Sequence, residues 1–132
     1  MFDFPYVYTG LAQLGIVMVA IFFMIRVGST RKKLGVVSPA TSGNETWECL
    51  SRVHMNTIEQ MVLFVPLMWL AAVLGNDVWA GGAGALWIVG RLVYSHLYIK
   101  RPASRGPGVM MTFAALLTVL VIVGMDLVPQ AF

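Results

Sequence analysis

The chain has 132 residues, of which 58% are hydrophobic and only 11% are charged, and its formal net charge is +3. About a quarter of the residues of a soluble domain are charged, so this composition excludes an ordinary soluble domain and argues against nucleic-acid binding. Four long apolar runs fill most of the length, and each has the roughly 20 residues that a membrane-spanning helix needs. We therefore predict one all-α integral membrane domain over residues 1–132, a bundle of four transmembrane helices.

The expected spans are, in chain order, about residues 6–27, 47–74, 78–100 and 107–128. The first has neither the basic start nor the cleavage site of a signal peptide, so we expect it to be retained. Gly75-Asn76-Asp77 is a turn signal after the second span. The third opens with the stretch AGGAGAL, which allows close helix contact, and ends before Pro102. Pro107 suits the start of the fourth.

The basic residues predict how the chain sits in the membrane. All nine Lys and Arg residues lie between Arg26 and Arg52 or between Arg91 and Arg105, in the first and third loops and the adjoining span ends. The positive-inside rule places both basic loops in the cytoplasm and both termini on the other side. We expect a multi-pass integral membrane protein, located in the inner membrane if the source is bacterial.

A polar stripe marks the cytoplasmic end of the second span. Arg52, Asn56 and Glu59 are spaced four and then three residues apart, which places them on one face of a helix, whereas His54 and Gln60 are expected to point elsewhere. Glu59 lies well inside the span. A charge at that depth usually marks a functional interior or a water-filled cavity.

The third span repeats the pattern. Arg91, Tyr94 and Tyr98 share one face, His96 lies away from them, and Arg105 follows in the short loop. The polar stripes of the second and third spans allow two interpretations.

One interpretation is that the two stripes satisfy each other, for example by pairing of Arg91 with Glu59. The surplus of arginines favours the other, an anionic ligand, because arginine binds carboxylates bidentately and stays charged when desolvated. A small charged peptide-like molecule would offer carboxylates to the arginines, an ammonium group to Glu59 and amides to Asn56. A lipid-soluble second substrate could enter the same site from the bilayer.

The chain resembles the membrane-associated proteins in eicosanoid and glutathione metabolism, the MAPEG family. The motifs that carry the resemblance are R-x-x-x-N-x-x-E at Arg52, Asn56 and Glu59, and R-x-x-Y-x-x-x-Y at Arg91, Tyr94 and Tyr98, with Arg105 beyond them. The resemblance extends over essentially the whole chain. It implies a homotrimer of four-helix protomers with glutathione, the co-substrate, bound between neighbouring subunits on the cytoplasmic side.

The resemblance also implies roles for single residues. The implied glutathione-binding residues are Arg52, His54, Asn56, Glu59, Arg91, Tyr94 and Tyr98, and the implied catalytic residues are Arg105 and Arg31. Family enzymes place a second cation near the thiol from the first loop, and Arg31, Lys32 and Lys33 are all candidates. The chain has Gln60 where many members have a tyrosine, so one binding hydroxyl is missing. For His54, an interfacial histidine that faces lipid headgroups is the alternative.

The implied activity is transfer of the glutathione thiolate to a hydrophobic, lipid-like electrophile, or peroxide reduction if that partner is a hydroperoxide. Nearby cations favour the thiolate, and lowering the thiol pKa by ~2 units corresponds to about 2.7 kcal/mol. One alternative is a non-catalytic member that binds lipid or glutathione. The other is a small multidrug transporter, which usually needs a carboxylate in its first span, where this chain has only Gln13.

Two other groups of residues predict no further chemistry. The histidines, His54 and His96, are far apart, and no cysteine or acidic cluster accompanies them at ligand spacing, so we expect no metal site. Cys49 is the only cysteine and has no partner for a disulfide within the chain. We expect it to pack at the start of a helix.

Overall fold

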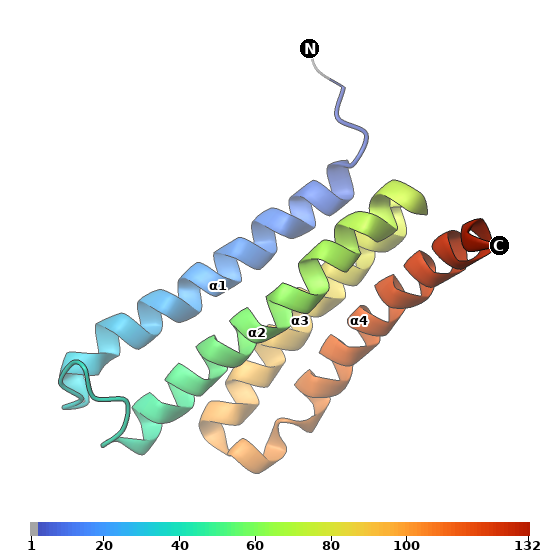
Figure 1. Ribbon diagram of the computed structural model, residues 1–132. Helices are drawn as coiled ribbons and strands as arrows, with labels where there is room; N and C mark the ends of the chain where they lie inside the picture. The colour runs from blue at the N-terminus through green and yellow to red at the C-terminus, as the bar shows by residue number, and fades with distance from the viewer. Residues whose placement is uncertain (1–2) are drawn as a thin grey trace.

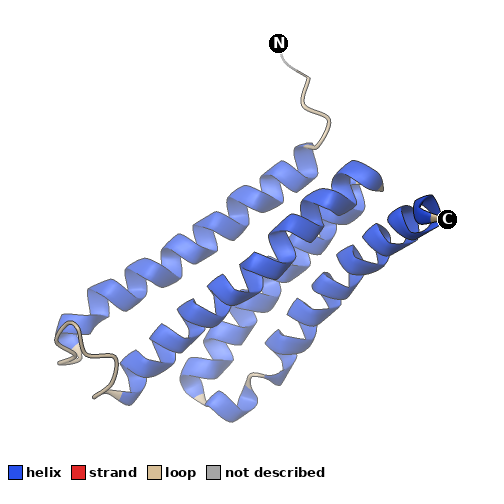
Figure 2. Cartoon of the chain, viewed as in Figure 1, coloured by secondary structure: helices blue, strands red, loops and turns tan. Residues whose placement is uncertain are grey.

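The computed structural model describes residues 3–132, which fold into helices with no strand among them (Figure 2). Four α-helices form the bundle, and two short 3-10 helices follow the third and the fourth. In chain order the elements are α1 (Val7–Lys33), α2 (Glu45–Leu74), α3 (Asp77–Lys100), η1 (Pro102–Ser104), α4 (Gly106–Leu127) and η2 (Val128–Ala131).

The two longer connections lie at the same end of the bundle. Figure 1 shows the α1–α2 loop and the α3–α4 connection together, with the α2–α3 turn, the start of α1 and the end of α4 at the opposite end. The Lys- and Arg-rich segments are therefore gathered at one end. That arrangement is the one the predicted orientation requires, and the orientation itself stays a prediction.

Three helical segments of residues 3–132 are long and apolar enough to cross a membrane: α1, α2 and Pro102–Ala131. Helix α3, which carries Arg91, Ser95 and His96, is not among these three segments. Helix α1 continues past Val27, where the first span was expected to end, and runs to Lys33. Its basic last turn suits a helix C-terminus, where the helix dipole favours cations.

Short polar and proline signals determine the helix ends. The Asn44 side chain accepts a hydrogen bond from the Trp47 backbone N–H at 3.0 Å and caps α2. Asn76 caps α3 in the same way. Helix α3 ends where Arg101 becomes extended ahead of Pro102, because proline disfavours helical geometry in the residue before it. The boundaries of helices α2 and α3 therefore lie at the predicted turn and before the predicted proline, while the membrane spans themselves stay a prediction.

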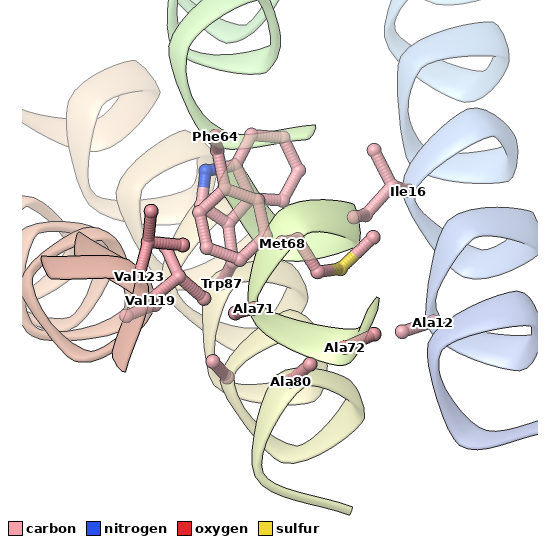
Figure 3. Close-up of a cluster of buried hydrophobic side chains, with 12 residues drawn as sticks. Ala12, Ile16, Phe64, Met68, Ala71, Ala72, Ala80, Trp87, Val119 and Val123 are labelled. Atoms are coloured by element: carbon pink, nitrogen blue, oxygen red, sulfur yellow. The ribbon is translucent and has the colours of Figure 1, made fainter. Parts of the chain in front are cut away.

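An apolar core fills the middle of the bundle, and all four helices contribute to it (Figure 3). The Phe64 and Trp87 rings stack with their centroids 5.6 Å apart, which joins α2 to α3. Ile16 of α1 and Val119 of α4 are fully buried against this centre. The core therefore fixes how the polar ends of the helices face one another.

The glycine-rich start of α3 packs closely against α1, as its composition predicts. A Cβ added to Gly81 would lie 2.6 Å from the Tyr8 Cβ, and one added to Gly84 would lie 2.6 Å from the Ala12 Cβ. Only residues without a side chain allow the two helices to approach so closely. The Asp77 carboxylate also accepts a hydrogen bond from the Tyr8 backbone N–H at 3.0 Å, which ties α1 to α3 at this end.

Candidate functional site

Arg91 of α3 is the centre of the polar contacts between α2 and α3. Its side chain is 1% exposed. Its Nη2 donates to Asn56 Oδ1 at 3.0 Å and to Thr57 Oγ1 at 3.0 Å, and its Nε donates to Thr57 Oγ1 at 3.2 Å. The guanidinium also lies over the Tyr94 ring, 4.1 Å from its centroid. A buried charge needs such partners to offset its lost hydration.

The contacts continue from Arg91 along α2 to the surface. Because Asn56 Oδ1 accepts from Arg91, its amide nitrogen is free to donate, and it does so to Glu59 Oε2 at 3.3 Å. Arg52 Nη1 lies 3.8 Å from Glu59 Oε1, and both side chains are more than half exposed on this single chain. Arg91 pairs with Asn56 and Thr57, so the suggested pairing of Arg91 with Glu59 is wrong.

A cavity of about 270 Å³ opens beside these contacts, and we call it the polar pocket. Its lining residues come from α2, α3, α4 and the residue before α4: Arg52, Asn56, Gln60, Arg91, Tyr94, Tyr98, Arg105, Val109, Thr112 and Phe113. The Tyr94 and Tyr98 rings lie side by side with centroids 5.4 Å apart. The pocket is cationic and phenolic on one side and apolar along α4, where Val109 and Phe113 lie.

Arg105 reaches the pocket from the residue immediately before α4. Its Nη1 donates to the Pro102 carbonyl at 3.0 Å, which holds the side chain across the η1 turn. The N-terminus of a helix carries a partial positive charge, and here it coincides with the arginine. This corner of the pocket therefore favours an anion.

Two glycines bring α4 close to the pocket side of α3, and sequence reasoning missed both. A Cβ added to Gly108 would lie 2.4 Å from the Tyr94 backbone N, and one added to Gly90 would lie 3.0 Å from the Thr112 backbone N. The helices touch backbone to backbone at these points. Glycine within a span was the available signal, because small residues mark close helix contacts in membranes.

Gln60 corrects one expectation, since its side chain lines the pocket instead of pointing elsewhere. Its Oε1 is buried and has no hydrogen-bond partner among the described residues. The physical reason is helix geometry: Arg52, Asn56 and Gln60 are spaced by four, so they follow the same stripe as Glu59. Thr57 is a further contact that the sequence motif did not include.

Three of the expected site residues do not line the polar pocket of this chain: Glu59, His54 and Arg31. Glu59 contacts it only indirectly, through Asn56 and Arg52. His54 is partly buried, and its Nδ1 has no hydrogen-bond partner among residues 3–132. Arg31 donates from Nη1 to the Ala40 carbonyl at 2.7 Å, and its guanidinium lies over the Trp47 ring at 4.3 Å. Arg31 therefore holds the α1–α2 loop within the protomer. Six expected residues do line one cavity: Arg52, Asn56, Arg91, Tyr94, Tyr98 and Arg105.

Comparison with known proteins places the whole bundle in one family. The sequence profile of the MAPEG family matches residues 9–125. An uncharacterized protein of Synechocystis is 36% identical over 81% of this chain and 77% of its own length. Human microsomal glutathione S-transferase 2 is 32% identical over 75% of this chain and 69% of its own length. Bovine leukotriene C4 synthase is 28% identical over 70% of this chain and 61% of its own length. The chain belongs to the MAPEG family.

Proposed function

We propose that the protein is a membrane-bound glutathione transferase that joins the glutathione thiolate to hydrophobic electrophiles. The names of two groups of relatives, microsomal glutathione S-transferase 2 and leukotriene C4 synthase, support this reaction class. The observation that carries the proposal is the polar pocket itself. Side chains of α2, α3 and the α4 start, which are far apart in sequence, converge there on one cationic and phenolic cavity.

Each part of glutathione has a matching group in or beside this cavity. Arg52 and Arg105 suit its carboxylates, because a guanidinium binds a carboxylate through two parallel hydrogen bonds. Glu59, at the exposed edge, suits its ammonium group. Tyr98 offers a hydroxyl, and Asn56 an amide whose orientation Arg91 determines. The buried Arg91 thus acts mainly by positioning Asn56.

Arg105 is our candidate for stabilising the thiolate. It lies at the N-terminus of α4, so the arginine charge and the helix dipole act on the same corner of the pocket. The thiolate is the nucleophile, and nearby positive charge shifts the thiol equilibrium toward it. The electrophile would lie along Val109 and Phe113, which form the apolar side of the cavity. We expect it to arrive from the bilayer.

We further propose that the functional unit is a homotrimer in which α3 also spans the membrane. Helix α3 has 24 residues, or about 36 Å at 1.5 Å per residue, enough for a hydrocarbon core of ~30 Å. On the single chain, Arg52 and Glu59 are 58% and 53% exposed. Charged groups within a span are costly when they face lipid. We therefore expect a neighbouring subunit, and not lipid, to contact Arg52 and Glu59.

Turnover by detergent-purified protein tests the proposal. With glutathione and an aryl halide electrophile, we expect turnover that falls about 100-fold in Arg105→Ala, the equivalent of ~2 units of thiol pKa. Arg101→Ala removes an exposed arginine of the same loop and should leave turnover unchanged. Thiolate absorbance in a stopped-flow mixing experiment should fall in parallel with turnover.

Two outcomes would redirect the assignment. Tight glutathione binding without a thiolate signal or turnover would identify a binding protein instead of an enzyme. Turnover that is confined to an organic hydroperoxide would identify a peroxidase. Equal activity of Arg105→Ala and the wild type would contradict the role of Arg105.

A further inference from the structure

A second cavity lies on the other side of α3, between α1 and α3, and the proposed reaction makes no use of it. We call it the Arg26 cleft. Its volume is about 420 Å³, and its lining includes Arg26, His96 and Lys100 together with Phe22, Leu92 and Ile99. None of these residues lines the polar pocket. The cleft combines three basic side chains with an apolar floor at the basic end of the bundle.

Arg26 is held in this cleft but has few hydrogen-bond acceptors. Its Nη2 donates to Ser95 Oγ at 2.7 Å, and its guanidinium carbon lies 5.3 Å and 4.9 Å from the ring centroids of Phe22 and Phe23. Its Nε is buried and has no partner among residues 3–132. A guanidinium has five N–H donors, so most of the donors of Arg26 remain available to a ligand.

The cleft also lacks a negative charge of its own. Among the described residues the only ion pair is between Arg52 and Glu59, so Arg26 and Lys100 have no carboxylate partner. Arg26 lies inside the predicted first span, where an unpaired charge is costly. An anionic ligand with several acceptor oxygens would offset that cost, and arginine suits the phosphate geometry in particular.

The apolar part of the cleft indicates what kind of molecule the anionic group belongs to. Phe22 lies one helical turn from Arg26 on α1, toward the middle of the membrane, and Leu92 lies one turn from His96 on α3 in the same direction. Both Phe22 and Leu92 are substantially exposed. A phosphate at Arg26 and Lys100 would therefore continue into an acyl chain along these two side chains.

We propose that the Arg26 cleft binds one anionic phospholipid of the cytoplasmic leaflet, with its phosphate on Arg26 and Lys100 and an acyl chain against Phe22 and Leu92. Juxtamembrane basic residues attract anionic lipid in general. The Arg26 cleft differs from that general attraction because Ser95 and two phenylalanine rings hold the guanidinium in place. The proposal is independent of the glutathione site.

Native mass spectrometry of the full-length protein in detergent tests the proposal. The probes are dioleoyl phosphatidylglycerol, dioleoyl phosphatidylcholine with the same acyl chains, and inorganic phosphate. We expect wild type to bind phosphatidylglycerol about tenfold tighter than phosphatidylcholine, and Arg26→Gln to lose that preference, because a charge-assisted hydrogen bond is lost. Arg101→Gln removes the same charge outside the cleft and should retain the preference.

The other outcomes overturn the proposal. If Arg26→Gln and Arg101→Gln lose the preference for phosphatidylglycerol to the same extent, the basic end attracts anionic lipid without a defined site. Inorganic phosphate that competes as well as the lipid would mean a free-phosphate site. If Arg26→Gln does not fold, Lys100→Gln is compared with Arg101→Gln instead, because both side chains are exposed. Glutathione turnover should be unchanged in Lys100→Gln, which separates this test from that of the proposed reaction.

Discussion

Thr57 is the residue on which the buried charge of α3 depends most directly. Its hydroxyl accepts two hydrogen bonds from Arg91 and donates to the Val53 carbonyl at 2.7 Å. Both Thr57 and Arg91 are almost fully buried, so no water replaces a lost bond. Hydrogen bonds to charged groups contribute more than neutral ones, and a buried donor left without a partner costs still more.

We predict that Thr57→Val lowers the free energy of unfolding by about 1.5–3 kcal/mol, because Arg91 loses a buried acceptor. Glutathione affinity should fall as well, since Arg91 would no longer hold Asn56 in one orientation. The measurement is denaturant unfolding in micelles together with glutathione titration. Thr118→Val is the matched control, because Thr118 is only partly buried and its hydroxyl donates only to the Ala114 carbonyl of its own helix. Equal effects of the two changes would contradict the role given to Thr57.

At the scale of elements, the polar pocket depends on how closely α4 approaches α3. Gly108 lies against the backbone of Tyr94, where a Cβ would come within 2.4 Å of the Tyr94 Cα and N. Backbone atoms cannot move aside as a flexible side chain can. The close contact also keeps Arg105, three residues earlier, next to the tyrosines of α3.

We predict that Gly108→Ala pushes α4 away from α3, destabilises the protein by about 1–3 kcal/mol and lowers glutathione affinity. Gly124→Ala on the same helix is the control, because no atom lies within 4 Å of a Cβ added there. Alanine favours a helix by about 1 kcal/mol over glycine, so the control should be slightly stabilised. Thermal unfolding of both variants decides this prediction, and a stable, fully binding Gly108→Ala variant would refute it.

At the scale of the whole molecule, one chain does not bring all the expected site residues into one pocket. Arg31 is engaged with the Ala40 carbonyl and Trp47, on the loop after α1, and does not line the polar pocket of its own protomer. Lys32 and Lys33 beside it are exposed. In the proposed trimer, a cation from this loop would serve the pocket of a neighbouring subunit. That arrangement agrees with the proposed trimer, in which the neighbour also covers Arg52 and Glu59.

Mixed assemblies test whether the site is shared. One variant is Arg105→Ala, and the other replaces Arg31, Lys32 and Lys33 by glutamine. We expect each to be inactive alone, and co-refolded mixtures to recover up to about a quarter of wild-type turnover, since random trimers place intact partners at some interfaces. No recovery, with trimers present by native mass spectrometry, would confine the site to one protomer. Full activity of the loop variant alone would exclude a role for these cations.

Much of the architecture follows from local chemistry that can be read along the chain. Asn76, Arg101-Pro102 and Pro107 lie at the helix boundaries where their backbone preferences predict them. The stripe of Arg91, Tyr94 and Tyr98 follows from the helical period alone, because residues three and four apart share a face whatever surrounds the helix.

The tertiary structure decided which groups of neighbouring helices meet. The helical period fixes where a side chain points around its own axis, but not how the adjacent helix is rotated or shifted along it. Packing of Phe64 on Trp87 and the contact of Gly108 with Tyr94 set those offsets. They bring Arg91 to Asn56 and Thr57 instead of Glu59. The sequence alone therefore determined the helices and their polar faces, and only the packing of the core determined the partners.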